Sequence, residues 1–134
     1  GGPAVPRPKE APAQAVQPVG YSPSSYPRFP SGLSQDAAYG KLMEAWGAGN
    51  KGTLDAVIPL LQALENCEMY GHGKGTIATT HEKLVHVFKK NEKWGRALYH
   101  ALEAKKIYEE TGDDYSSKNI QRSIDLCRRA GAEE

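Results

Sequence analysis

The sequence lacks several features that mark common classes of protein. It has only two cysteines, Cys67 and Cys127, which lie far apart and outside any CxxC pair. This pattern favours two reduced thiols on helices over a disulfide framework, and therefore a reducing compartment. No apolar run approaches the roughly 18 residues needed to span a bilayer. We therefore expect a soluble, intracellular protein without a membrane span.

An excess of charge of one sign is also missing. The formal net charge is +1, with 17 Lys and Arg against 16 Asp and Glu. A nucleic-acid binder needs a basic excess on one face to contact phosphates, so we expect no nucleic-acid partner. The chain opens on Gly1 and Gly2 instead of Met. We interpret this start either as processing, which would have removed an organellar transit peptide, or as the remnant of an added tag.

Proline is nearly absent after residue 30, because eight of the nine prolines precede it and only Pro59 follows. Proline removes a backbone donor and fixes φ, so residues 1–32 are predicted to form an extended, proline-rich arm before a helical domain at 33–134. A flexible linker is the simpler interpretation of this arm. The alternative is an anchor segment in which Tyr21, Tyr26 and Phe29 bind a groove of another protein.

The remaining sequence has helical periodicity. Ser34 is a plausible cap for a first helix that ends at a glycine-rich break at 47–50, and Thr53 caps a second helix over 54–70. Pro59 should kink that helix or delay its regular start. Residues 76–112 predict two helices around a polar elbow at 89–93, and a fifth helix follows over 115–130. In the fourth helix, small residues such as Ala97, Ala101 and Ala104 share one face, which predicts close packing against a neighbour.

The second and fourth predicted helices echo each other at a fixed offset of 41 residues. Without gaps, Ala56 aligns with Ala97, Ala63 with Ala104, and Gly71 with Gly112. Two helix hairpins at a constant offset, followed by a single helix, indicate a short solenoid with a terminal cap.

Residues 81–112 resemble a tetratricopeptide repeat (TPR). The resemblance rests on Leu84 and Phe88 in the first helix, Trp94 at the start of the second, Ala97 and Ala104, and the closing sequence IYEETGD. It is good over this repeat, partial over 33–71 and absent from the arm, and it departs where Val85 replaces the usual small residue. The resemblance implies a protein-binding superhelix without catalysis.

In this family the groove is lined by the first helix of each pair. On this register the groove positions are Thr79, Glu82, His86, Lys89 and Lys90. Members that clamp a terminal carboxylate use lysine and asparagine where this chain has Glu82 and His86, so that clamp is rejected. Lys89 and Lys90 either meet an acidic partner or are a solvated pair at the end of a helix.

Two other motifs resemble reactive or ligand-binding sites. HEKLVH places His81 and His86 at i and i+5, about 140° apart on a helix, so both cannot bind one zinc ion. The loop at 71–76, GHGKGT, suits an anion through its backbone N–H groups but lacks the order of a phosphate loop. His100 is interpreted simply as a packed or half-exposed residue.

We predict an all-α fold of about five helices, two TPR-like hairpins and a capping helix, preceded by the arm. The function expected is that of a non-catalytic accessory or scaffold subunit, whose partners are other protein subunits of a larger complex. We expect no enzyme activity, cofactor or metal. The alternatives are a free adaptor that captures a peptide in its groove, and a small enzyme or anion-binding regulator that uses the 71–76 loop.

Overall fold

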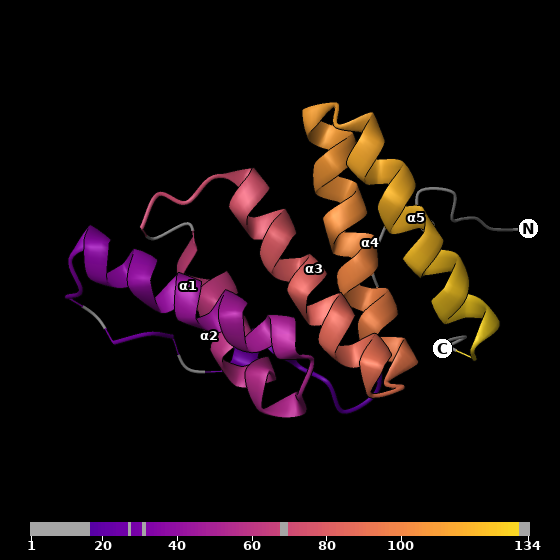
Figure 1. The fold of residues 1–134 in the computed structure, drawn as a ribbon, viewed down its shortest axis with the longest axis horizontal. Helices are drawn as coiled ribbons and strands as arrows, with labels where there is room; N and C mark the ends of the chain where they lie inside the picture. The colour runs from indigo at the N-terminus through magenta and orange to yellow at the C-terminus, as the bar shows by residue number, and fades with distance from the viewer. Residues whose placement is uncertain (1–16, 27, 31, 68–69, 132–134) are drawn as a thin grey trace, which may run out of the picture.

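Five α-helices follow one another in the chain, and each packs against its neighbours (Figure 1). This computed structural model describes residues 17–26, 28–30, 32–67 and 70–131, and this part of the chain contains no strand. The predicted all-α fold with five helices is confirmed. The first half of the predicted arm, residues 1–16, lies outside the described residues. The helices are α1 (Gln35–Lys51), α2 (Val57–Cys67), α3 (Lys74–Lys90), α4 (Trp94–Thr111) and α5 (Asp114–Arg129).

The first helix is longer than the sequence pattern predicts. Ser34 caps it by accepting a hydrogen bond from the backbone N–H of Ala37, as expected. The predicted stop at 47–50 is wrong, because α1 continues to Lys51 and ends at Gly52, whose φ is 78°. The buried Gly49 explains the continuation: a Cβ there would lie 3.1 Å from a methyl group of Leu60. Glycine here serves close packing within the helix rather than termination.

The second helix starts late, as Pro59 predicts. A short 3-10 turn, η3 (Leu54–Ala56), precedes the regular helix, which places Pro59 in the first turn of α2. There its missing N–H has no helical partner to lose. The predicted cap, Thr53, makes no capping hydrogen bond; its hydroxyl donates to Asp55 instead.

The third helix lies at the centre and contacts the other four. Around it the buried side chains form two apolar clusters. The cluster between α3, α4 and α5 includes Ala101 and Ala104 of the predicted small face of α4, together with Ile120 and Ile124 of α5. Its buried members are Ala78, Val85, Ala101, Ala104, Tyr108, Ile120 and Ile124.

The other cluster joins α1, α2 and α3 to part of the arm, and it also includes Ala97 of α4 and Cys127 of α5. Tyr21 and Phe29 are only 4% and 8% exposed, and Tyr26 packs against the same cluster. In Figure 1 the indigo segment passes from the start of α4 to α2. The described part of the arm is therefore packed on the helices of its own chain, and includes a short turn, η2 (Pro23–Ser25). Its aromatic residues contribute to the core of the helical domain.

Candidate functional site

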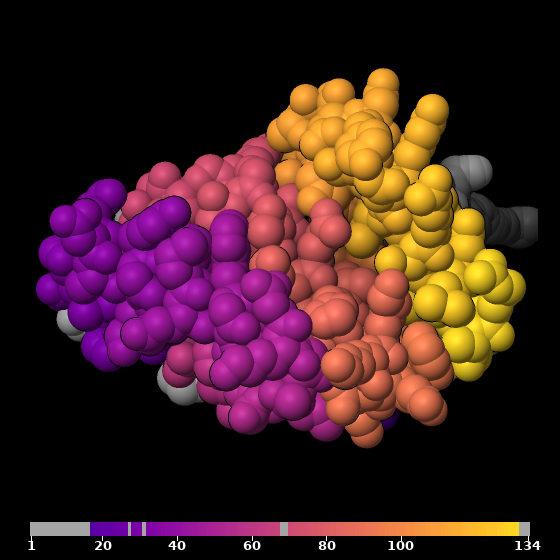
Figure 2. Space-filling model, viewed as in Figure 1, coloured from indigo at the N-terminus to yellow at the C-terminus, as the bar shows by residue number. Residues whose placement is uncertain are grey.

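A hollow between α1 and α3, which we call the α1–α3 groove, has a volume of about 320 Å³. Figure 2 shows the face on which α1 and α3 are adjacent. Lys83 crosses between the two helices: its Nζ donates to Oδ1 of Asn50 at 2.8 Å and lies 5.7 Å from the centre of the Trp46 ring. The groove is lined by Asn50, Thr79, Glu82, Lys83 and His86.

Three of the five groove positions predicted from the sequence line this hollow: Thr79, Glu82 and His86. Glu82 is linked to α4, because its carboxylate accepts a hydrogen bond from the hydroxyl of Tyr108. Burial, and then this hydrogen bond to a carboxylate, raise the pKa of Tyr108, so its hydroxyl stays protonated. One wall of the groove is thereby fixed by α4, while His86 is exposed.

The two lysines predicted for the groove lie outside its lining. Lys89 points toward α5, where its Nζ donates to the hydroxyl of Ser123 at 2.9 Å. Lys90 packs over Gly52, where an added Cβ would come within 2.5 Å of its Cδ. The end of α3 thus uses Lys89 and Lys90 against neighbouring elements of the same chain.

Sequence reasoning missed two members of the lining, Asn50 and Lys83. Lys83 could have been found, because residues 79, 82, 83 and 86 form one stripe at i, i+3, i+4 and i+7 of a helix. Asn50 could not, because it lies in the stretch that was interpreted as a break between helices.

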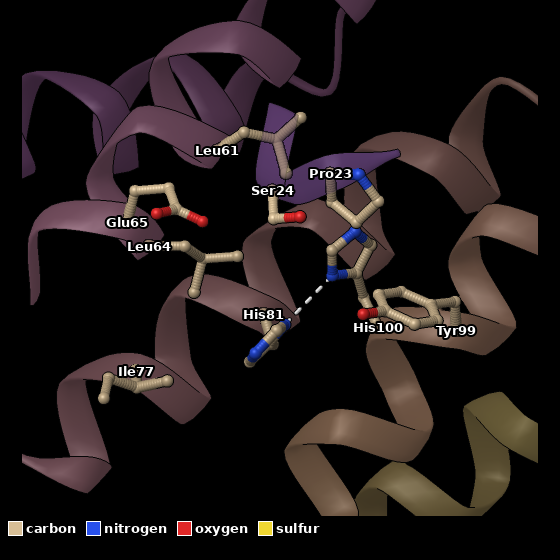
Figure 3. Close-up of a pocket in the computed structure, with 9 residues that line it drawn as sticks. All are labelled: Pro23, Ser24, Leu61, Leu64, Glu65, Ile77, His81, Tyr99 and His100. Carbon is tan, nitrogen blue, oxygen red and sulfur yellow. Dashed lines mark hydrogen bonds between the residues drawn. The ribbon is translucent and has the colours of Figure 1, made fainter. Parts of the chain in front are cut away.

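A second polar feature is buried between the arm, α3 and α4. The hydroxyl of Tyr21 lies 2.7 Å from Nε2 of His100. Nδ1 of His100 lies 2.9 Å from Nδ1 of His81, the contact drawn as a dashed line in Figure 3. His100 is fully buried and His81 is 8% exposed. We call this chain of three side chains the Tyr–His–His relay. The sequence did not predict that these three side chains contact one another, because residues 21, 81 and 100 share no local motif.

Both histidines of the relay are held neutral. Burial, and then the nearby charge of Lys106, lower the pKa of His81 to about 4. Burial, and then His81 itself, lower the pKa of His100 well below its usual value. Two neutral imidazoles can form an N–H···N hydrogen bond, in which Nδ1–H of one ring donates to Nδ1 of the other. This bond satisfies both Nδ1 atoms.

Beside the relay lies a pocket of about 200 Å³, shown in Figure 3. The arm contributes Pro23 and Ser24 to its wall, and α2 contributes Glu65, whose carboxylate lies 3.4 Å from Nε of Arg28. In the described part of the chain, no three His, Cys, Asp or Glu side chains gather as metal ligands would. The other lining residues are Leu61, Leu64, Ile77, His81, Tyr99 and His100.

In the two other motifs singled out in the sequence, HEKLVH and the 71–76 loop, the key side chains are separated or already paired. His81 is buried while His86 is exposed beside the α1–α3 groove, so the two histidines of HEKLVH lie on different faces of α3. In the 71–76 loop, Lys74 begins α3 and its Nζ lies 3.1 Å from a carboxylate oxygen of Glu110. The charge of this lysine is thus already paired within the chain.

No protein-family model matches this chain, and neither the curated proteins nor the solved structures contain a significant match. Among the described residues, every helix is too short or too polar to cross a membrane. Over residues 17–26, 28–30, 32–67 and 70–131, the findings define an all-helical arrangement in which five helices pack in chain order, compatible with a helical repeat.

Proposed function

We propose that the chain is a non-catalytic, TPR-like interaction module that serves as an accessory or scaffold subunit in a larger protein assembly. The observation that carries this proposal is the α1–α3 groove, where Thr79, Glu82 and His86 surround one hollow. The arrangement of the helices as two consecutive hairpins and a last helix supports it, as does the 41-residue echo between α2 and α4.

The chemistry of the groove favours a polar protein segment as its occupant. Lys83 and Glu82 supply opposite charges, each already held by Asn50 or Tyr108, and Thr79 and His86 add a hydroxyl and an imidazole. Groups fixed by such neighbours lose little side-chain entropy on binding, which favours specific recognition. The same groove supports the second candidate function, in which a free adaptor captures a short peptide there.

Thr79→Arg tests the groove. The half-buried Thr79 lies in the wall, so an arginine would fill the hollow and place a second cation near Lys83. We expect at least about a tenfold loss of co-purifying partner proteins when tagged chains are recovered from the native source. Thr111→Arg is the matched control, because Thr111 is exposed at the end of α4.

Partner capture that is equal for the two variants would contradict the assignment of the groove. A wild-type chain that is recovered alone, as a monomer, would contradict the subunit proposal. Recovery of short, separable peptides instead of a stable complex would favour the adaptor.

A further inference from the structure

The ring of Tyr21 occupies a socket made by α3 and α4. It meets Phe88, Tyr99 and His100 edge to face, with ring centres 5.6, 6.3 and 5.7 Å away. The guanidinium carbon of Arg96 lies 5.0 Å from the centre of the Tyr21 ring, in the position of a cation–π contact. Aromatic edges and a cation therefore surround a phenol ring that is 4% exposed.

The base of the socket is specific for a hydroxyl group. Nε2 of His100 contacts the hydroxyl of Tyr21, and His81 fixes the other nitrogen of the same ring. With phenylalanine in the socket, the fully buried Nε2 would have no partner, and unpaired buried polar groups discriminate strongly between ligands. The relay thus distinguishes tyrosine from other aromatic residues.

The segment around Tyr21 is held by separate side-chain contacts. Pro18 lies over Gly95 on α4, where an added Cβ would be 3.5 Å from the proline ring. Pro23 is buried, and Arg28 pairs with Glu65 on α2. Apart from the short turn η2, these residues belong to no helix. The recognition elements are thus a tyrosine, flanking prolines and an arginine on one segment, which turns between Pro18 and Tyr21 and again at η2.

These contacts do not depend on the segment belonging to the same chain. We propose that the socket is a recognition site for a proline-flanked, tyrosine-bearing segment of a partner protein, and that residues 17–26 and 28–30 are its resident occupant. Each proline fixes its own φ, so such a segment has less conformational entropy to lose on docking. This inference rests on the proposed function as an interaction module and names a second binding surface, separate from the α1–α3 groove.

The chain's own segment competes with a partner segment for the socket, and this competition sets the apparent affinity for the partner. A covalently linked segment has an effective concentration in the millimolar range, so a partner segment must outcompete it or be held nearby by other contacts. Removing the resident tyrosine should therefore open the socket to a free peptide.

The test uses a labelled synthetic peptide of residues 17–30, QPVGYSPSSYPRFP, and the full chain carrying Tyr21→Ala. Fluorescence anisotropy should show saturable binding, at least about tenfold tighter than to the wild-type chain. A peptide with phenylalanine in place of Tyr21 should bind roughly three- to tenfold more weakly, and one with alanine should show no saturable binding.

Further variants separate the socket from general peptide adhesion. Arg96→Ala, added to the Tyr21→Ala chain, should weaken binding about threefold or more by removing the cation over the ring. Arg122→Ala, on the exposed face of α5, is the matched control and should leave the affinity unchanged. If Tyr21→Ala does not fold, Tyr21→Phe keeps the ring and should still bind the peptide more tightly than wild type.

The inference is overturned if a folded Tyr21→Ala chain binds no peptide, or binds the tyrosine and alanine peptides equally. Its failure is distinguishable from failure of the proposed function, because that proposal is tested by Thr79→Arg in the other groove.

Discussion

At the scale of single residues, the most unusual feature is the Tyr–His–His relay, in which buried polar side chains pair with one another. It buries three polar side chains that satisfy one another across the arm, α3 and α4. The charged and titratable groups facing it are Glu65 on α2, Arg96, Tyr99 and Lys106 on α4, and Arg28 and Tyr26 on the arm. No carboxylate is bonded to either histidine among the described residues, so a protonated imidazole would have no compensating partner there.

Protonation should therefore destabilise the fold. The pKa of His81 falls from 6.5 to about 4 on folding, and burial also lowers the pKa of His100 well below its usual value. The folded state binds fewer protons than the unfolded state below pH 6.5, so this contribution to stability is complete above that pH. It is lost as the pH falls from 6.5 through about 4. Urea denaturation between pH 7.5 and 4.5 should show the loss, at most about 1.4 kcal/mol per pH unit for each histidine.

His86→Gln is the control for this pH dependence. His86 is exposed and lies outside the buried pair, so its removal should leave the contribution of His81 and His100 in place. A wild-type chain whose free energy of unfolding stays constant from pH 6.5 to 4.5 would contradict the buried neutral pair.

Loss of the Tyr21 hydroxyl should lower the free energy of unfolding by a large amount for a change of one atom. Tyr21→Phe removes the hydrogen bond to His100 and leaves a buried imidazole nitrogen unpaired, which should lower the free energy of unfolding by about 1–3 kcal/mol. Tyr39→Phe, at a side chain that is 55% exposed, should change it by less than about 0.5 kcal/mol. Equal effects in chemical denaturation would place Tyr21 outside the buried core.

At the scale of elements, α1 shows where local sequence signals stop being sufficient. The end of α4 and the start of α5 follow from local signals: Gly112 has a φ of 75°, and Asp113 accepts from the N–H of Ser116. In α1 the same kind of signal, glycine, misleads because Gly49 is buried against Leu60 and Lys83. That contact comes from other helices, so no window of local sequence contains it.

Two glycines of α1 should therefore respond oppositely to substitution. Gly47 is exposed and nothing lies near a Cβ added there, so Gly47→Ala should raise the free energy of unfolding by about 0.5–1 kcal/mol. Gly49→Val should lower it by about 1–3 kcal/mol, because the side chain would press on Leu60 and on Cβ of Lys83. Thermal and urea denaturation measure both changes, and a stabilising Gly49→Val would contradict the close approach of α1 to α2 and α3.

At the scale of the whole molecule, the described part of the arm belongs to the core. The prolines predict an extended stretch that is set apart from the helices, and that boundary stays a prediction. Composition alone could not say what the aromatic residues of the stretch touch. Tyr21 and Phe29 are buried against helices of the same chain. That an arm residue binds a partner protein stays a prediction. The all-α fold was accessible because helical periodicity is local. The groove positions came from the resemblance to the TPR, and their role in binding stays a prediction.

The arm should dock as a unit. Tyr21→Ala and Phe29→Ala should each lower the free energy of unfolding by about 2–4 kcal/mol, and the double variant by clearly less than the sum. The reason is that releasing one anchor already frees much of the segment. Val19→Ala, at a side chain that is 97% exposed, is the neutral control. Strictly additive losses would show that the two anchors are independent.

The central claim is that the α1–α3 groove faces a protein partner, and side-chain footprinting of His86 tests it most directly. His86 is exposed in the free chain and lies in the groove wall beside Thr79. The account predicts that diethyl pyrocarbonate labels His86 readily in the isolated chain and several-fold more slowly in the assembly purified from the native source. Labelling of His86 at the same rate in both states would contradict it.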